Sequence, residues 1–169
     1  SNWELFETVV TDQRKGVPMP PYEKEYPEDS ILVDLVPHEE INLETKQVYE
    51  TITKRRSRRR YTKTPMTLME LSYLLISTHG ILNPKRPMFR TSPSGGARHG
   101  IETYLYVENV TGVDKGLYRY LPVEHKLLWI GNKPKEDLTE ALAGQDFHPA
   151  VTFVWTAVPY RIAWRYSHA

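Results

Sequence analysis

The segment from Thr67 to Gly80 carries both the start and the stop signals of one amphipathic helix. Thr67 and Glu70 form a Thr-x-x-Glu capping box, in which each side chain can satisfy a backbone amide that the first helical turn leaves free. Gly80 ends the pattern, as glycine commonly does after a helix. Four leucines are spaced to line one face: Leu68, Leu71, Leu74 and Leu75. The chain must therefore build a core against this helix.

The residues after this helix show the alternation typical of strands. Three strands are predicted, over 103–107, 117–120 and 126–130, and the short turns between them favour an antiparallel meander. A helix is predicted over 134–142, with its apolar side at Leu138, Ala141 and Leu142. The Val, Thr, Phe and Trp content of residues 150–158 predicts a buried strand.

A further helix is expected before the capping box, beginning near Asn42 and turning Leu43, Val48 and Ile52 inward. The resulting order of helices and strands predicts an α+β fold around a mixed, mainly antiparallel sheet flanked by helices.

Proline marks the part of the chain before these elements. Five prolines between Gly16 and Pro37 exclude helix interiors and central strands: Pro18, Pro20, Pro21, Pro27 and Pro37. Tyr and aliphatic residues among them favour an extended arm packed over the domain. We therefore expect residues 1–40 to form an N-terminal extended Pro-rich arm and residues 41–169 to belong to a single domain.

Composition excludes several classes of protein. No apolar stretch approaches the roughly 20 residues of a membrane helix, so no membrane partner is expected. The chain has no Cys, which fits a reducing compartment, and a cytoplasmic location is predicted. Its six His residues lack metal-ligand spacing, and no metal is expected: His38, His79, His99, His125, His148 and His168.

A cationic segment is the strongest functional signal. Six of the seven residues from Lys54 to Arg60 are Lys or Arg, and Ser57 is the exception, although the formal net charge of the chain is only +1. Guanidinium groups offer rigid forks of charge-assisted donors and a serine hydroxyl adds an adaptable one, which is the donor set that a phosphate dianion requires.

Three interpretations of the cationic segment compete. It could be a solvated helix end, since cations are favourable near a helix C-terminus. It could bind nucleic acid, but a pI near 7.9 and the lack of a second basic stripe argue against that reading. A small phosphate-bearing cofactor explains a charge excess that is confined to one place.

A second candidate site is the small-residue turn formed by Pro93, Ser94, Gly95 and Gly96. Its glycines would let backbone amides approach a flat ligand closely, although such turns more often only connect two elements. The turn lacks the Gly-Lys-Ser or Gly-Lys-Thr end of a Walker loop and the Gly-x-Ser-x-Gly of a hydrolase elbow.

Together these motifs resemble the nitroreductase superfamily of flavoenzymes. Arg55 to Tyr61, Pro65 and the helix that follows resemble the opening of that family, and the string from Arg90 to His99 with Glu102-Thr103-Tyr104 resembles its SagB-type dehydrogenase branch. The resemblance also includes Gly116 to Tyr120. It runs from about Ile31 to Ala169.

The resemblance implies a nitroreductase-like fold and an FMN-dependent oxidoreductase whose active sites form at a homodimer interface. The FMN phosphate would bind at Arg55, Arg56, Ser57 and Arg59, and the ring at Pro93, Ser94, Gly95 and Gly96, with His99 nearby. NAD(P)H is the expected reductant, and a small molecule or a peptide the expected substrate. No catalytic acid or base is assigned.

Members of the family continue well past the segment that matches Trp164 to Tyr166, so the domain is expected to be incomplete at the C-terminus. Two alternatives to an enzyme follow. One is a non-catalytic remnant of a flavin fold that acts as a binding or assembly partner, and the other is a polyanion binder that uses the cationic segment.

Overall fold

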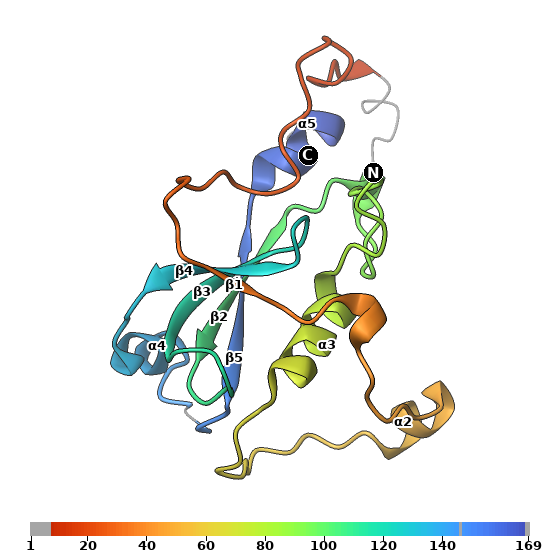
Figure 1. The fold of residues 1–169 in the computed structure, drawn as a ribbon. Helices are drawn as coiled ribbons and strands as arrows, with labels where there is room; N and C mark the ends of the chain where they lie inside the picture. Colours follow the sequence, from red (N-terminus) through yellow and green to blue (C-terminus); the bar gives the residue numbers. More distant parts are fainter. Residues whose placement is uncertain (1–7, 146, 168–169) are drawn as a thin grey trace.

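The computed structural model describes residues 8–145 and 147–167. Its centre is a five-stranded sheet with the order β1-β4-β3-β2-β5, in which all neighbouring strands are antiparallel (Figure 1). The predicted α+β fold with an antiparallel meander is therefore confirmed. The strands are β1 Leu32–Asp34, β2 Ile101–Val107, β3 Gly116–Leu121, β4 Lys126–Gly131 and β5 Val151–Ala157.

Helix α3 (Leu68–His79) covers one face of the sheet, and its capping box is present as predicted. The backbone amide of Thr67 donates to Glu70 Oε2 at 2.8 Å, and the amide of Glu70 donates to Thr67 Oγ1 at 3.1 Å. Leu71 and Leu75 are fully buried against strand residues such as Leu105. Each such side chain contributes roughly 1.5–3 kcal/mol through burial.

The buried stripe of α3 differs from the prediction at Leu74. Leu74 is exposed, whereas Ser72, Ile76 and His79 are buried beside the two leucines. A helix advances about 100° per residue, so the buried positions share one side of the helix surface. Leu74 lies outside that side.

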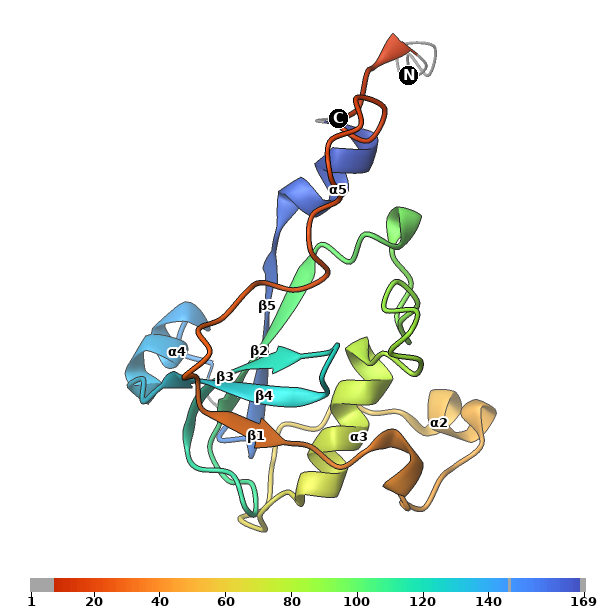
Figure 2. The same ribbon diagram turned by 45° about the horizontal axis from the view of Figure 1, so that its top comes forward.

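The N-terminal arm packs on the opposite face of the sheet, and Figures 1 and 2 draw it as an extended chain that runs from beside α5 to β1. Arg119 on β3 donates to the carbonyl of Lys24 at 2.7 Å, and Arg90 donates to the carbonyl of Tyr22 at 2.9 Å. The Tyr26 hydroxyl donates to Glu124 at 2.6 Å. Arginine side chains of the domain thus donate hydrogen bonds to backbone carbonyls of the arm, which has no regular secondary structure there to satisfy them. The boundary at residue 40 stays a prediction.

Helix α2 (Val48–Lys54) is shorter than predicted and begins after Gln47, not near Asn42. The expectation that Val48 and Ile52 point inward is wrong, because they are 74% and 69% exposed. Every residue of α2 except Glu50 is exposed, so the apolar spacing that suggested an inward face does not correspond to a buried face in this chain.

Helix α4 (Lys135–Ala141) is present as predicted. Of its three predicted apolar positions, Leu138 is half-buried, whereas Ala141 and Leu142 are exposed. Strand β5 is also present, but its predicted burial is wrong: residues 151–154 are half-buried and residues 155–157 are exposed, with Trp155 58% exposed. The strand lies at the edge of the sheet, so β propensity there does not imply burial.

Among the described residues, three elements were not predicted: the three-residue β1, the one-turn helix η1 (His38–Glu40), and helix α5 (Pro159–Tyr166), which begins with proline at its first position. Across the described ranges, no helix has both the length and the apolar character needed to cross a membrane.

Candidate functional site

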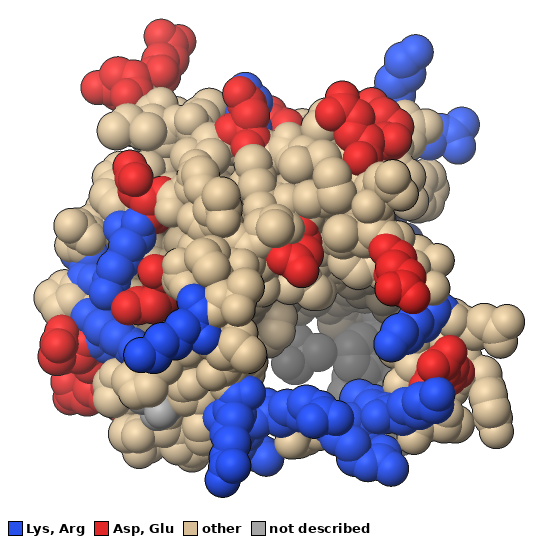
Figure 3. Space-filling view, turned by 60° about the horizontal axis from the view of Figure 1, so that its bottom comes forward, with Lys and Arg blue, Asp and Glu red and all other residues tan. Residues whose placement is uncertain are grey.

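The cationic segment lies at the end of α2, as its charge pattern suggested. Lys54 is the last helical residue and pairs with Glu50 at 2.9 Å, and Arg55 to Arg60 follow as exposed chain without regular structure. Figure 3 shows Lys and Arg side chains in a row along one edge of the molecule, beside a hollow. A cavity of about 770 Å³ is lined by Arg60, Lys63 and neighbouring residues.

Contacts within the cationic segment are local. Arg55 Nη1 lies 3.4 Å from Ser57 Oγ, and Arg56 Nη1 donates to the carbonyls of Arg55 at 2.8 Å and Thr53 at 3.3 Å. Among the described residues, no carboxylate forms an ion pair with Arg55 to Arg60. The guanidinium groups are thus concentrated without an internal counter-ion, which favours an external anion.

The Pro93–Gly96 turn is held by several hydrogen bonds. Ser94 Oγ accepts from the backbone amide of His99 at 2.9 Å, and Arg98 Nε donates to the carbonyl of Gly96 at 2.9 Å. Gly95 to Ala97 form the one-turn helix η2, in which Gly96 has φ of +56°. Glycine adopts this conformation without strain, and a Cβ at this position would also meet Arg165.

His99 lies beneath the turn and is only 4% exposed. Its Nε2 lies 2.9 Å from the carbonyl of Met88, and its backbone adopts φ of +46°. Burial lowers the pKa of His99 below its ordinary value, with Arg90 among the neighbours that add to the effect. The imidazole ring is therefore buried and contacts the backbone at Met88. The predicted position of His99 near the flavin stays a prediction.

Helix α5 covers the turn with residues that sequence reasoning missed. A Cβ built on Gly96 would lie 2.4 Å from Arg165 Cδ and 2.8 Å from the Tyr166 hydroxyl, so both side chains press against the glycine. Arg161 of the same helix donates to the carbonyl of His99 at 3.2 Å and forms an ion pair with Glu102 on β2. No local pattern in the sequence signals these contacts, because they join distant segments.

His79, the last residue of α3, adds to the electrostatics beneath the turn. Its ring stands edge-on to that of His99, with 6.1 Å between centroids. Burial, with smaller contributions from Arg90, His99 and Arg161, lowers the pKa of His79 to about 4. The imidazole is therefore neutral near pH 7. In the part of the chain that the structure describes, no group of three or more His, Asp or Glu residues could hold a metal ion.

The two predicted parts of the site are not brought together within one chain. Figures 1 and 2 draw α2, which leads into the cationic segment, apart from the loop that carries η2, which lies beyond the C-terminal end of α3. Arg55, Arg56, Ser57 and Arg59 are all exposed on the first part. On the second, Pro93 and Gly95 are exposed, and Ser94 and Gly96 are half-buried.

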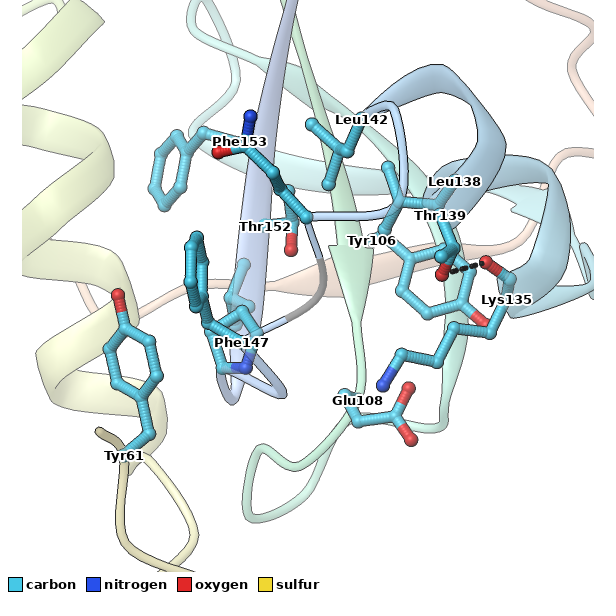
Figure 4. A pocket seen from close by; sticks show the side chains of 13 residues that line it. Tyr61, Tyr106, Glu108, Lys135, Leu138, Thr139, Leu142, Phe147, Thr152 and Phe153 are labelled. Carbon is cyan, nitrogen blue, oxygen red and sulfur yellow. Dashed lines mark hydrogen bonds between the residues drawn. The ribbon is translucent and has the colours of Figure 1, made fainter. Parts of the chain in front are cut away.

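A separate pocket lies between α4, β5 and Tyr61 (Figure 4). It has a volume of about 360 Å³ and combines apolar side chains such as Leu138 and Phe147 with Glu108 and Lys135. None of the predicted cofactor residues lines it.

The fold is similar to those of several solved structures, of which three are described. A candidate nitroreductase from Anabaena variabilis superposes with a TM-score of 0.66 at 24% identity, covering 98% of this chain and 31% of that one. A candidate nitroreductase from Ralstonia eutropha gives 0.61 at 24% identity, covering 86% and 67%. The Escherichia coli microcin synthetase McbBCD complex gives 0.54 at 20% identity, covering 79% and 55%. The predicted nitroreductase-like fold is confirmed.

Sequence comparison supports the same assignment. A candidate nitroreductase of Methanocaldococcus jannaschii, MJ1384, is 38% identical over 102 residues, which are 60% of this chain and 48% of that protein. The chain thus spans about half the length of this curated relative. The sequence profile of the Nitroreductase family matches residues 52–168, from the last turns of α2 onward. The chain belongs to the nitroreductase family.

Proposed function

We propose that this chain is the FMN-binding portion of a SagB-type, FMN-dependent oxidoreductase. One observation carries the proposal: in a member of the nitroreductase family, the cationic segment is exposed and no described carboxylate pairs with Arg55 to Arg60. Such a segment is stabilised by an external dianion, and a cofactor phosphate is one.

The residues present fit a phosphate. Arg55 and Ser57 already lie within 3.4 Å of each other, so a guanidinium and a hydroxyl can donate to one phosphate. Arg56 and Arg59 stand within the same exposed stretch and can add further charge-assisted donors. The Ser57 hydroxyl can rotate, so it adds an adaptable donor to the rigid guanidinium groups of the arginines.

The flavin ring would lie against the Pro93–Gly96 turn of a second copy of the chain. Two features support this arrangement: the turn and the cationic segment lie apart within one chain, and the exposed Gly95 presents backbone without a Cβ to a flat ligand. The composite site thus requires a homodimer. Backbone donors of the turn would orient the ring, and the cationic segment would anchor its phosphate.

When bound, FMN supplies hydride and electron transfer, with NAD(P)H as the expected reductant. The substrate class is a small organic molecule or a peptide. The peptide option is supported by the similar McbBCD complex, whose structure holds a truncated pro-MccB17. The chain itself contributes binding and orientation, and no proton donor is assigned.

The test is FMN titration of the purified chain, followed by absorbance in the flavin bands. Arg59→Ala should weaken FMN binding by about 1.5–3 kcal/mol, roughly 10- to 150-fold, because a charge-assisted contact is lost. Arg86→Ala, an exposed arginine outside the segment, is the matched control and should bind as the wild type does. Equal affinities for the two variants would contradict the assignment.

The exposed cationic segment also favours a second candidate, a polyanion binder. Retention on heparin that persists in saturating FMN would support this alternative. A wild-type chain that folds but never takes up FMN would instead support a non-catalytic remnant that serves as an assembly partner.

A further inference from the structure

A buried ion pair connects the sheet to the loop beneath the Pro93–Gly96 turn. Glu102 on β2 and Arg161 on α5 form it, and their side chains are 3% and 4% exposed. Because desolvating two charges is costly, a buried pair of this kind is weak evidence for stability. Its presence therefore calls for a role in fixing local structure.

The pair is bonded directly to the loop. Besides contacting Glu102, the Arg161 guanidinium donates through Nη1 to the carbonyl of His99 at 3.2 Å. The amide of His99 in turn donates to Ser94 Oγ at 2.9 Å. One continuous chain of contacts thus runs from a carboxylate on the sheet to a serine of the turn.

The backbone on both sides of this chain of contacts is under constraint. Ala97 and His99 both have positive φ, of +54° and +46°, which non-glycine residues adopt only when their surroundings hold them. At Gly100, a Cβ would lie 2.9 Å from Ile162 Cγ1, so α5 packs directly on the loop. Arg161 is thus placed where it can hold a loop conformation that the backbone does not favour.

Local charge explains why Glu102 is needed. Arg90 and Arg161 both lower the pKa values of His79 and His99, and Glu23 and Glu102 are the carboxylates that act on Arg90. Glu102 is the carboxylate paired with Arg161, and without it the guanidinium would be an uncompensated buried cation. Arg161 would then lose the carboxylate that orients its guanidinium, whose Nη1 donates to the His99 carbonyl.

We propose that Glu102 and Arg161 are positioning residues that fix the Ser94–His99 loop, and through it the backbone donors offered to the flavin ring. This inference rests on the proposed function for its flavin part. The ion pair acts through the turn and touches neither cofactor nor substrate, so neither residue is assigned a catalytic role.

The first test measures amide hydrogen exchange by NMR in the full chain. Glu102→Gln should raise the exchange rate of the His99 amide by at least about tenfold, more than that of amides in the β2–β3 ladder, such as Leu105. Asp34→Asn is the matched control, because it removes the carboxylate of an exposed ion pair, with Lys126 on β4. A uniform rise at His99 and Leu105 would show a merely structural role and overturn the proposal, as would no rise at His99.

A second variant covers the case in which Glu102→Gln unfolds the chain. In Glu102→Gln/Arg161→Met both buried charges are removed, so no unpaired ion remains and the fold should be regained. Met also carries no donor for the His99 carbonyl. The bond to the His99 carbonyl is still lost, so fast exchange at His99 is expected to remain. Wild-type protection of His99 in this double variant would overturn the proposal.

The second test adds FMN. If the loop places the ring, Glu102→Gln or the double variant should bind FMN about 10- to 100-fold more weakly and shift its absorbance bands, because small misplacements of orienting groups are costly. Unchanged affinity and bands, together with faster His99 exchange, would remove the flavin part of the inference. If the wild type binds no FMN, the proposed function fails, whereas the exchange measurement still decides whether the pair holds the loop.

Discussion

The Pro93–Gly96 turn and the cationic segment are assigned to one cofactor, yet the chain holds them in different ways. The turn is supported by side-chain hydrogen bonds from Arg98 and to Ser94, by a buried His99 and by close packing of α5 on Gly96. The cationic segment is exposed throughout, and within the described ranges the side-chain hydrogen bonds of Arg55 and Arg56 go to residues at most three positions away along the chain.

This difference separates two strategies of ligand binding. A turn built into the fold is preorganised, so its geometry depends on the stability of the domain. An exposed run of guanidinium groups repels itself and gains order from the anion that it binds. Substitutions at the turn should therefore change the free energy of unfolding, and those in the cationic segment should change affinity alone.

The largest expected effect is a pH dependence of stability that arises beneath the turn. The pKa of His79 is about 4 in the folded chain and about 6.5 when unfolded, so the unfolded chain binds the proton more readily. Stability should be fully present above about pH 6.5 and should fall by up to about 3 kcal/mol as pH drops to about 4. Urea unfolding across this range measures it.

Three neighbours face His79 and contribute to this shift: Arg90 from the loop after α3, His99 from below the turn and Arg161 from α5. His79→Gln should reduce the pH dependence without abolishing it, because the pKa values of His99 and His125 are also lowered. His38→Gln, at an exposed histidine, should leave it unchanged. A wild-type slope in His79→Gln would show that the acid sensitivity arises elsewhere.

Next in size is the effect of a methyl group at the turn. Gly96→Ala should cost about 2 kcal/mol in thermal or urea unfolding, because positive φ is combined with contacts from Arg165 and Tyr166. Gly112 has φ of +80°, but no atom would lie within 4 Å of a Cβ at this position. Gly112→Ala should therefore show only the backbone cost, about 1 kcal/mol of stability. Equal losses would mean that α5 does not press on the turn.

Two serines give a sharper contrast. Ser57→Ala should weaken FMN binding about fivefold, or about 1 kcal/mol, with unfolding unchanged within about 0.5 kcal/mol. Ser94→Ala should instead cost about 1 kcal/mol of stability, because the buried His99 amide loses its acceptor. FMN titration and urea unfolding of both variants test this contrast. A stability loss in Ser57→Ala together with an affinity loss alone in Ser94→Ala would contradict it.

The smallest effect is expected at the start of the cationic segment. Glu50→Gln removes the partner of Lys54, in a pair whose side chains are 38% and 75% exposed. An exposed i,i+4 pair contributes about 0.3–0.5 kcal/mol, so unfolding should change by no more than that. A loss above about 1 kcal/mol would indicate that α2 is tied to the rest of the domain after all.

The parts of the fold that were predictable are those with local signals. The capping box located α3, and alternation located β2, β3 and β4. The start of α2 was misplaced because Asn42 offered a cap without a buried face behind it. Strand β1 is too short for a periodic pattern, and it is defined by its pairing with β4.

The candidate site was predictable to the same extent. The cationic segment is visible as charge in the sequence, and its place after a helix was predicted correctly. The contact between Glu102 and Arg161 was not, because it depends on β2 pairing with β5, which sets Glu102 opposite Thr156 just before α5 begins. A buried carboxylate gives no sequence signal of its partner when that partner lies on another element.

The N-terminal arm has a consequence for how the protein is made. Its residues Gln13 and Val17 bond to Trp164 on α5, through the Gln13 amide to the Trp164 carbonyl and the Trp164 indole to the Val17 carbonyl, both at 2.9 Å. A ribosome releases the arm long before it releases α5. The contacts of Gln13 and Val17 with Trp164 can therefore form only after synthesis has delivered α5.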